Sequence, residues 1–116
     1  MYKLKYHPNL TIERWNDFPR HKRILMIANE LQRALNMIDK NDRTEFRNAL
    51  ERAFELLDLT VETTSRRNEI RELLRLRELM AQSFLDENID RSPVESMMNA
   101  LISMDKTAFH QLDQND

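Results

Sequence analysis

The chain has 116 residues, a formal net charge of −2, a hydrophobic share of 41%, and neither cysteine nor glycine. Without cysteine there is no disulfide framework and no thiolate chemistry. Without glycine there is no phosphate-cradling glycine-rich loop. Glycine is also the usual residue in the tight turns between strands, so its absence disfavours a sheet protein. The abundant Leu, Arg, Glu, Met, Gln and Ala are good helix formers, and together these observations predict one all-α domain.

Charge is unevenly distributed along the chain. Residues 1–23 hold six Lys or Arg and two acidic residues, whereas residues 82–116 hold two basic and seven acidic residues. A basic head and an acidic tail can attract each other across a dimer, although solvated surface is the commoner outcome of such charge runs.

The opening segment Tyr2-Lys3-Leu4-Lys5-Tyr6 alternates apolar and basic residues, which is typical of a half-buried strand. Everything after residue 10 is predicted to be helical, so this segment has no strand to join. Three arrangements stay open: the arm lies over the helices and buries Tyr2, Leu4 and Tyr6, it pairs with its copy in a second chain, or it orders when a partner binds. We expect one of the first two, with residues 1–18 forming an arm and a short helical turn.

The first long helix is predicted over residues 19–39. Asp17 is placed to cap it, and Pro19 falls in its first turn, where a missing N–H does no harm. Its apolar seam steps by three and four residues and consists of Ile24, Ala28, Leu31, Leu35 and Ile38. Three cations stand in the first turn, the wrong end for the helix dipole: Arg20, Lys22 and Arg23. Their placement indicates that they face a partner or an acidic neighbour.

Asp42, followed three residues later by Glu45, resembles a capping box and begins a second helix that runs to about residue 62. The short link before it makes the first two helices an antiparallel hairpin. Thr63-Thr64-Ser65 are poor helix formers and good N-caps, so they predict a third helix over residues 66–87. Apolar residues cover more than half of that helix, which predicts a central position or burial on two sides.

The strongest local signal is Ser92-Pro93-Val94-Glu95, with an N-cap Ser, Pro at the first position and Glu at the third. It begins a fourth helix. Asp105 is then expected to cap a last short helix with Phe109 and Leu112, and residues 113–116 to form a disordered tail. The predicted fold is all-α: an antiparallel four-helix bundle over residues 19–112 with a short N-terminal extended arm.

Catalytic and metal chemistry have few candidates. The three histidines are far apart in the sequence, and no carboxylate stands three residues before a histidine as in di-iron bundles. Arg14 and His21 have the six-residue spacing of an Arg and a His in HEPN-type ribonucleases, but Pro19 interrupts the stretch. We therefore expect a non-enzymatic protein with no catalytic residue, no metal and no cofactor, and rank the ribonuclease last.

An arginine stripe is the candidate for nucleic-acid binding. Arg67, Arg71 and Arg75 recur every four residues, with Arg66 beside them, and such a row can neutralise phosphates. The interleaved Glu residues form competing i,i+3 and i,i+4 pairs, so a solvated face is favoured. An RNA-binding bundle stays the alternative function.

Methionine and phenylalanine give the candidate partner-binding residues: Met80, Phe84, Met97 and Met98. Flexible thioethers suit surfaces that accept helical partners, and they also fill ordinary cores. The leading interpretation is a protein-contact module, an adaptor, chaperone or self-associating protein, with a groove that receives a protein helix or a second copy. No apolar run approaches the length that spans a bilayer, and no signal-peptide h-region is present, so we expect a cytoplasmic protein.

Four stretches carry a family resemblance. They are Leu25-Met26-Ile27 after a proline, a hairpin turn near Asp39–Asp42, Ala53-Phe54-Glu55-Leu56-Leu57, and Ala81-Gln82-Ser83-Phe84-Leu85-Asp86-Glu87-Asn88 before a proline-started helix. In this layout the chain resembles the flagellar export chaperones, small helical bundles that hold secreted flagellar subunits unfolded. The resemblance implies a helical bundle with a protein client, and it assigns no binding residue.

Overall fold

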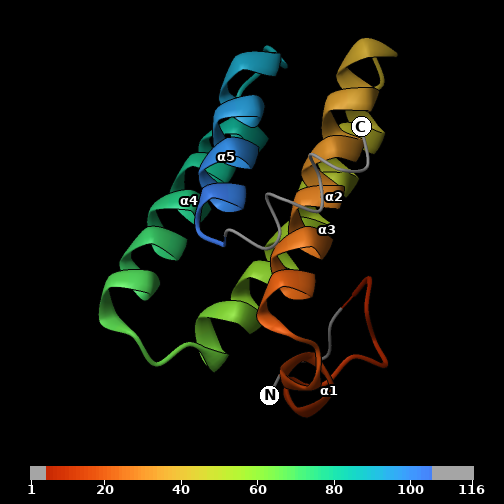
Figure 1. Cartoon of the computed structure of the whole chain (residues 1–116). Coiled ribbons are helices and arrows are strands. Elements are labelled where there is room, and N and C mark those ends of the chain that lie inside the picture. The colour runs from red at the N-terminus through yellow and green to blue at the C-terminus, as the bar shows by residue number, and fades with distance from the viewer. Residues whose placement is uncertain (1–4, 106–116) are drawn as a thin grey trace.

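Five helices make up residues 5–105, the part of the chain that this computed structural model describes (Figure 1). They are α1 (Ile12–Asp17), α2 (Arg20–Asp39), α3 (Arg43–Thr63), α4 (Arg67–Leu85) and α5 (Arg91–Ser103). No strand occurs within these residues, so the predicted all-α class is confirmed. The predictions for Tyr2, Leu4, the last short helix and the tail lie outside the described residues.

The helices pack in a ring of neighbours. α2 contacts α3 and α5, while α4 contacts the same two helices from the other side, and α1 packs on α3. Figure 1 shows α2 beside α3 and α4 beside α5. Between them lies one apolar core whose largest fully buried side chains include Trp15, Ile27, Leu31, Phe46, Leu50, Leu57, Leu73, Met80, Met97 and Leu101.

The link between α2 and α3 follows the predicted capping chemistry. The Asp42 carboxylate accepts a hydrogen bond from the backbone N–H of Glu45 at 3.1 Å, which satisfies one of the free donors at the start of α3. The preceding residue, Asn41, has φ of 56°. Asparagine tolerates this left-handed conformation better than most residues, so it supplies the turn that glycine usually makes.

Three predicted caps are wrong. The cap residue of α2 is Pro19, whose side chain has no acceptor to offer, and the predicted cap Asp17 is instead the last residue of α1. α5 begins before the predicted Ser92 cap: the carboxylate of Asp90 accepts the N–H of Ser92, and Pro93 falls third, where a helix still needs no donor. The hydroxyls of Thr63 and Thr64 donate back to carbonyls of α3 and do not cap α4.

The predicted central position of the third long helix is also wrong. Only Leu73, Leu76 and Met80 of α4 are buried, so the helix contacts its neighbours along a single stripe. The apolar content of α4 fits two arrangements equally well. The helix can be buried on two sides, or it can be buried on one side with its other leucines exposed to solvent. The outer surface of α4 therefore carries exposed leucines that need an explanation.

Ion pairs join the helices around this core. Glu30 of α2 is 8% exposed, and its carboxylate accepts from Arg52 of α3 at 2.8 Å and from Arg33 at 3.3 Å. Arg91 of α5 donates to Asp39 of α2 at 2.5 Å. The Arg52 and Arg91 pairs each join two helices, whereas the Arg33 pair lies within α2. At Glu30 the paired Arg satisfies a carboxylate that burial alone would destabilise.

Candidate functional site

Exposed leucines mark α4 as the candidate contact surface. Within residues 5–105, four large hydrophobic side chains are exposed, and three of them belong to α4: Leu74 at 48%, Leu79 at 43% and Leu85 at 75%. Ile70, Leu74, Ala81 and Leu85 are spaced by four, seven and four residues, so they share one side of the helix. We call these four residues the α4 face. Leu79 projects from the other side of the buried stripe.

Aromatic and ionic contacts bind the neighbouring side of α4 to α3. Phe84 packs edge-to-face on Phe54 with ring centroids 6.2 Å apart, and the Arg77 guanidinium lies 5.3 Å from the Phe54 ring. Arg77 also donates to Asp58 of α3 at 2.7 Å. These contacts hold α4 in place, so the α4 face is carried on a rigid element.

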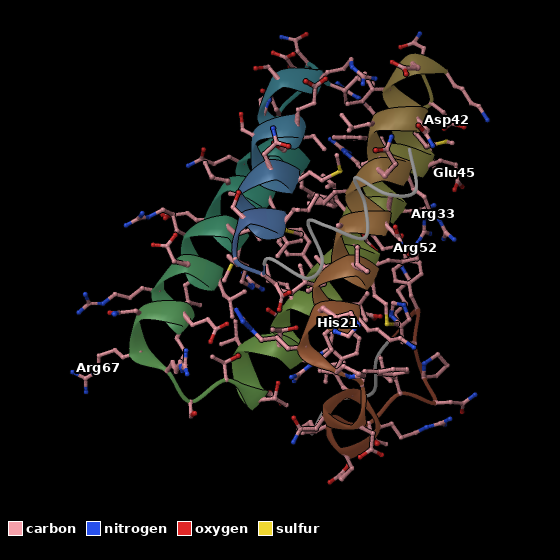
Figure 2. The ribbon with its side chains drawn as sticks, viewed as in Figure 1. His21, Arg33, Asp42, Glu45, Arg52 and Arg67 are labelled. Carbon is pink, nitrogen blue, oxygen red and sulfur yellow. The ribbon has the colours of Figure 1, made fainter. Side chains whose placement is uncertain are left out.

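Basic side chains border the α4 face. Arg66, Arg67, Arg71 and Arg75 are all exposed, and Figure 2 shows Arg67 projecting away from the helices. Arg75 is 3.7 Å from Glu72, in the i,i+3 pairing expected from the sequence. The side chains of Arg66, Arg67 and Arg71 have no hydrogen-bond or ion-pair partner among the described residues. This part of the stripe is thus free to meet an acidic or phosphate-bearing partner.

The predicted groove residues lie mostly in the core. Met80 and Met97 are 0% exposed, while Phe84 and Met98 are partly buried. In this arrangement the two methionines contact the chain's own helices, and the four residues do not form one open groove. The exposed leucines were the signal that sequence reasoning missed, because helical periodicity does not tell which apolar residues lack a neighbour.

The start of the chain contacts α3 through polar groups. The backbone N–H groups of Lys5 and Tyr6 donate to the carboxylate of Glu55 at 2.5 and 3.0 Å. The Tyr6 hydroxyl donates to Glu51 at 2.7 Å, and this hydrogen bond is the main cause that raises the pKa of Tyr6. Residues 5–10 form no strand, since side-chain oxygens of a helix take the place of a partner strand.

Arg14 and His21, the ribonuclease candidates, lie on different helices. The Arg14 guanidinium donates to the carbonyl of Asn9 at 3.3 Å, and His21 lies in the first turn of α2 (Figure 2). None of the hydrogen bonds or ion pairs described for residues 5–105 joins the two side chains. The same range contains no cluster of three or more His, Asp or Glu side chains arranged to hold a metal ion.

None of the helices in the described range is both long and apolar enough to cross a bilayer. Comparisons of the chain with protein-family models, with curated proteins and with solved structures give no match.

Proposed function

We propose that this chain is a non-enzymatic cytoplasmic protein, an antiparallel four-helix bundle with an N-terminal arm, that acts through protein–protein contact and associates with a second copy through the α4 face. The observation that carries the proposal is the exposure of Leu74 and Leu85 on one side of a rigid helix. Apolar side chains gathered in this way on a surface mark interaction sites.

The sequence of α4 is self-complementary when a second α4 lies antiparallel to it. With the crossing point between Arg77 and Glu78, Ile70 meets Leu85 of the partner subunit, and Leu74 meets Ala81 of the partner subunit. The small Ala81 leaves room for the leucine opposite. Every such contact occurs twice in a two-fold interface, so four residues form a continuous apolar seam.

Charge favours the antiparallel direction. The first half of α4 carries the free Arg67 and Arg71, whereas the chain just beyond its end carries Asp86, Glu87 and Asp90. Antiparallel pairing lays the basic half of each helix along the acidic end of the other, while parallel pairing sets like charges against each other. Complementary charge of this kind sets orientation and suppresses wrong partners.

Sedimentation equilibrium over a range of protein concentrations tests the proposal. We expect a monomer–dimer equilibrium, with Leu74→Glu raising the dissociation constant at least about tenfold because it buries a charge in the seam. Leu79→Glu is the matched control, since Leu79 is exposed to nearly the same degree on the other side of the helix. A strictly monomeric wild-type protein contradicts the proposal, and so does an equal effect of the two substitutions.

RNA binding is the second candidate, supported by the three arginines of the stripe that lack a partner among the described residues. Retention on immobilised RNA that falls steeply with salt, and that is lost in an Arg67→Gln/Arg71→Gln variant, would favour it. A chaperone-like role would place a client helix on the same α4 face. Competition between dimer formation and client binding would identify that role.

A further inference from the structure

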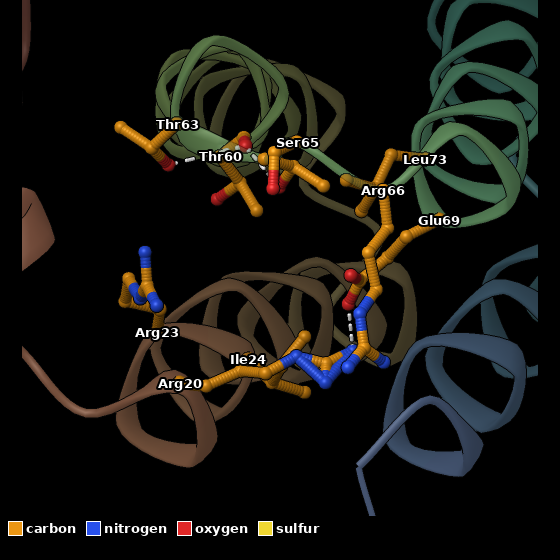
Figure 3. Close-up of a pocket in the computed structure, with 10 residues that line it drawn as sticks. Arg20, Arg23, Ile24, Thr60, Thr63, Ser65, Arg66, Glu69 and Leu73 are labelled. Carbon is orange, nitrogen blue, oxygen red and sulfur yellow. Dashed lines mark hydrogen bonds and ion pairs between the residues drawn. The ribbon is translucent and has the colours of Figure 1, made fainter.

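We infer that the pocket enclosed by the start of α2, the end of α3 and the start of α4 binds a phosphate group, either free or as part of a small phosphorylated molecule. The pocket encloses about 320 Å³, which lies within the range of small-molecule sites. Figure 3 shows its lining, in which Arg20 and Arg23 come from α2, Thr63 and Ser65 from the end of α3 and the link, and Arg66 from the start of α4.

Arg23 is the first group that points to an anion. Its Nε is fully buried and has no hydrogen-bond partner in the described part of the chain. Within residues 5–105 its guanidinium makes a single hydrogen bond, from Nη1 to the side-chain oxygen of Asn16 at 3.3 Å. A buried donor on a charged group that lacks an acceptor is destabilising, and an oxyanion in the pocket would offset that cost by pairing with the guanidinium charge.

Arg66 is the second group. Its guanidinium has no hydrogen-bond or ion-pair partner among residues 5–105, and it lines the same pocket from the start of α4. Guanidinium groups match the oxygen geometry of phosphate and bind it through two parallel N–H donors. Two guanidinium groups with free donors therefore lie on two walls of one cavity.

Arg20 and Glu69 have a different task. Glu69 is ion-paired with Arg20, which also donates to the carbonyl of Met104 at 3.1 Å. The charges of Arg20 and Glu69 cancel each other. The net positive charge of the pocket therefore comes from Arg23 and Arg66. Arg20 is thus a positioning residue, and we do not assign it to the ligand.

Backbone and hydroxyl donors complete the pocket. The cap residue of α4 makes no side-chain hydrogen bond, so the first N–H groups of this 19-residue helix have no cap and carry the positive end of its dipole. The Thr63 and Thr64 hydroxyls donate to α3 carbonyls, which leaves the Ser65 hydroxyl as the side-chain donor on that wall. The pocket also accounts for Arg20 and Arg23 in the first turn of α2, a position at which the helix dipole disfavours cations.

Isothermal titration of the full chain with inorganic phosphate, and separately with glycerol 3-phosphate, tests the inference against chloride at equal ionic strength. We expect saturable one-site binding, lost or weakened at least about tenfold in Arg23→Gln and in Arg66→Gln, since each removes a charge-assisted donor. Arg71→Gln is the matched control, an exposed arginine of α4 outside the pocket. Tighter binding of glycerol 3-phosphate would identify the ligand as a phosphomonoester, and equal or weaker binding as free phosphate.

Two results would overturn the inference. One is the absence of any saturable binding of either probe. The other is equal weakening by Arg71→Gln and Arg23→Gln, which would mean that phosphate only screens surface charge. If Arg23→Gln unfolds the chain, Arg66→Gln keeps the test decisive, because Arg66 is exposed. Leu74→Glu should still bind phosphate, so failure of the dimer and failure of this site are distinguishable.

Discussion

His7 Nδ1 lies 2.7 Å from Oε2 of Glu55, a carboxylate on α3 that is only 8% exposed. The same carboxylate accepts the backbone N–H groups of Lys5 and Tyr6. One acidic side chain thus holds three consecutive residues of the arm. Its buried charge is tolerated because these donors satisfy the carboxylate.

Replacing Glu55 should release the arm. Glu55→Ala removes three charge-assisted hydrogen bonds, and we expect it to lower the free energy of unfolding by about 2–3 kcal/mol. Urea unfolding measures the loss, and limited trypsin digestion should cleave after Lys5 faster than in the wild type. Glu62→Ala, at an exposed position of the same helix, should change neither quantity. An unchanged cleavage rate in Glu55→Ala would refute the holding role.

The arm illustrates where sequence reasoning stops. Period-two alternation in residues 2–6 predicted a strand, and the described part of the arm instead binds a carboxylate almost 50 residues away. The one available signal was Glu55 itself, an acid inside the apolar run Ala53-Phe54-Glu55-Leu56-Leu57. Local patterns do not report which distant group will satisfy a free backbone donor.

Helix positions were more predictable than helix surroundings. Apolar seams and the Asp42 cap placed α2 and α3 within a residue or two, because both signals are local. The start of α5 was missed because Asp90 caps as well as Ser92 does. The exposure of Leu74 and the pocket around Arg23 both depend on which helices pack side by side. The cations in the first turn of α2 were a sequence signal for the pocket, whereas the exposure of Leu74 had none.

A hydrogen bond in the core gives a second stability test. The indole Nε1 of the fully buried Trp15 donates to the Thr60 hydroxyl at 3.1 Å, and that hydroxyl donates to the carbonyl of Leu56. Thr60→Val leaves the indole N–H buried without an acceptor and should cost about 1–3 kcal/mol. Trp15 is the single tryptophan of the chain, so its fluorescence reports unfolding in urea. Thr60→Ser keeps the oxygen and should lose less; equal losses would assign the effect to packing.

Ionisation of Tyr6 should be shifted to high pH. The Glu51 carboxylate accepts from its hydroxyl and raises the pKa of Tyr6 above 10.0. A raised pKa in the folded state means that the contribution of this group to stability is present below pH 10.0 and is lost as the pH rises through the folded pKa. In a Tyr2→Phe background, Tyr6 is the remaining tyrosine and its absorbance can be titrated. Glu51→Gln should lower the midpoint, and a midpoint that does not move would remove Glu51 as the cause.

Charge reversal tests the direction of the proposed α4 pairing. In the antiparallel dimer Arg67 lies near Glu87 of the partner subunit, so Arg67→Glu or Glu87→Arg alone should weaken association on the order of tenfold. The estimate reflects two symmetric exposed pairs of up to about 1 kcal/mol each. The double variant should regain most of the affinity in sedimentation equilibrium. Additive weakening in the double variant would rule out this register.

The left-handed backbone conformation of Asn41 limits which residues can occupy this position in the turn between α2 and α3. In a chain without glycine, this position is the single one within residues 5–105 with positive φ. A residue whose branched Cβ crowds the next carbonyl would strain the link by roughly 1–2 kcal/mol. Natural or engineered variants of this protein should therefore keep Asn, Asp or Gly at that site, while the flanking Lys40 is free to vary.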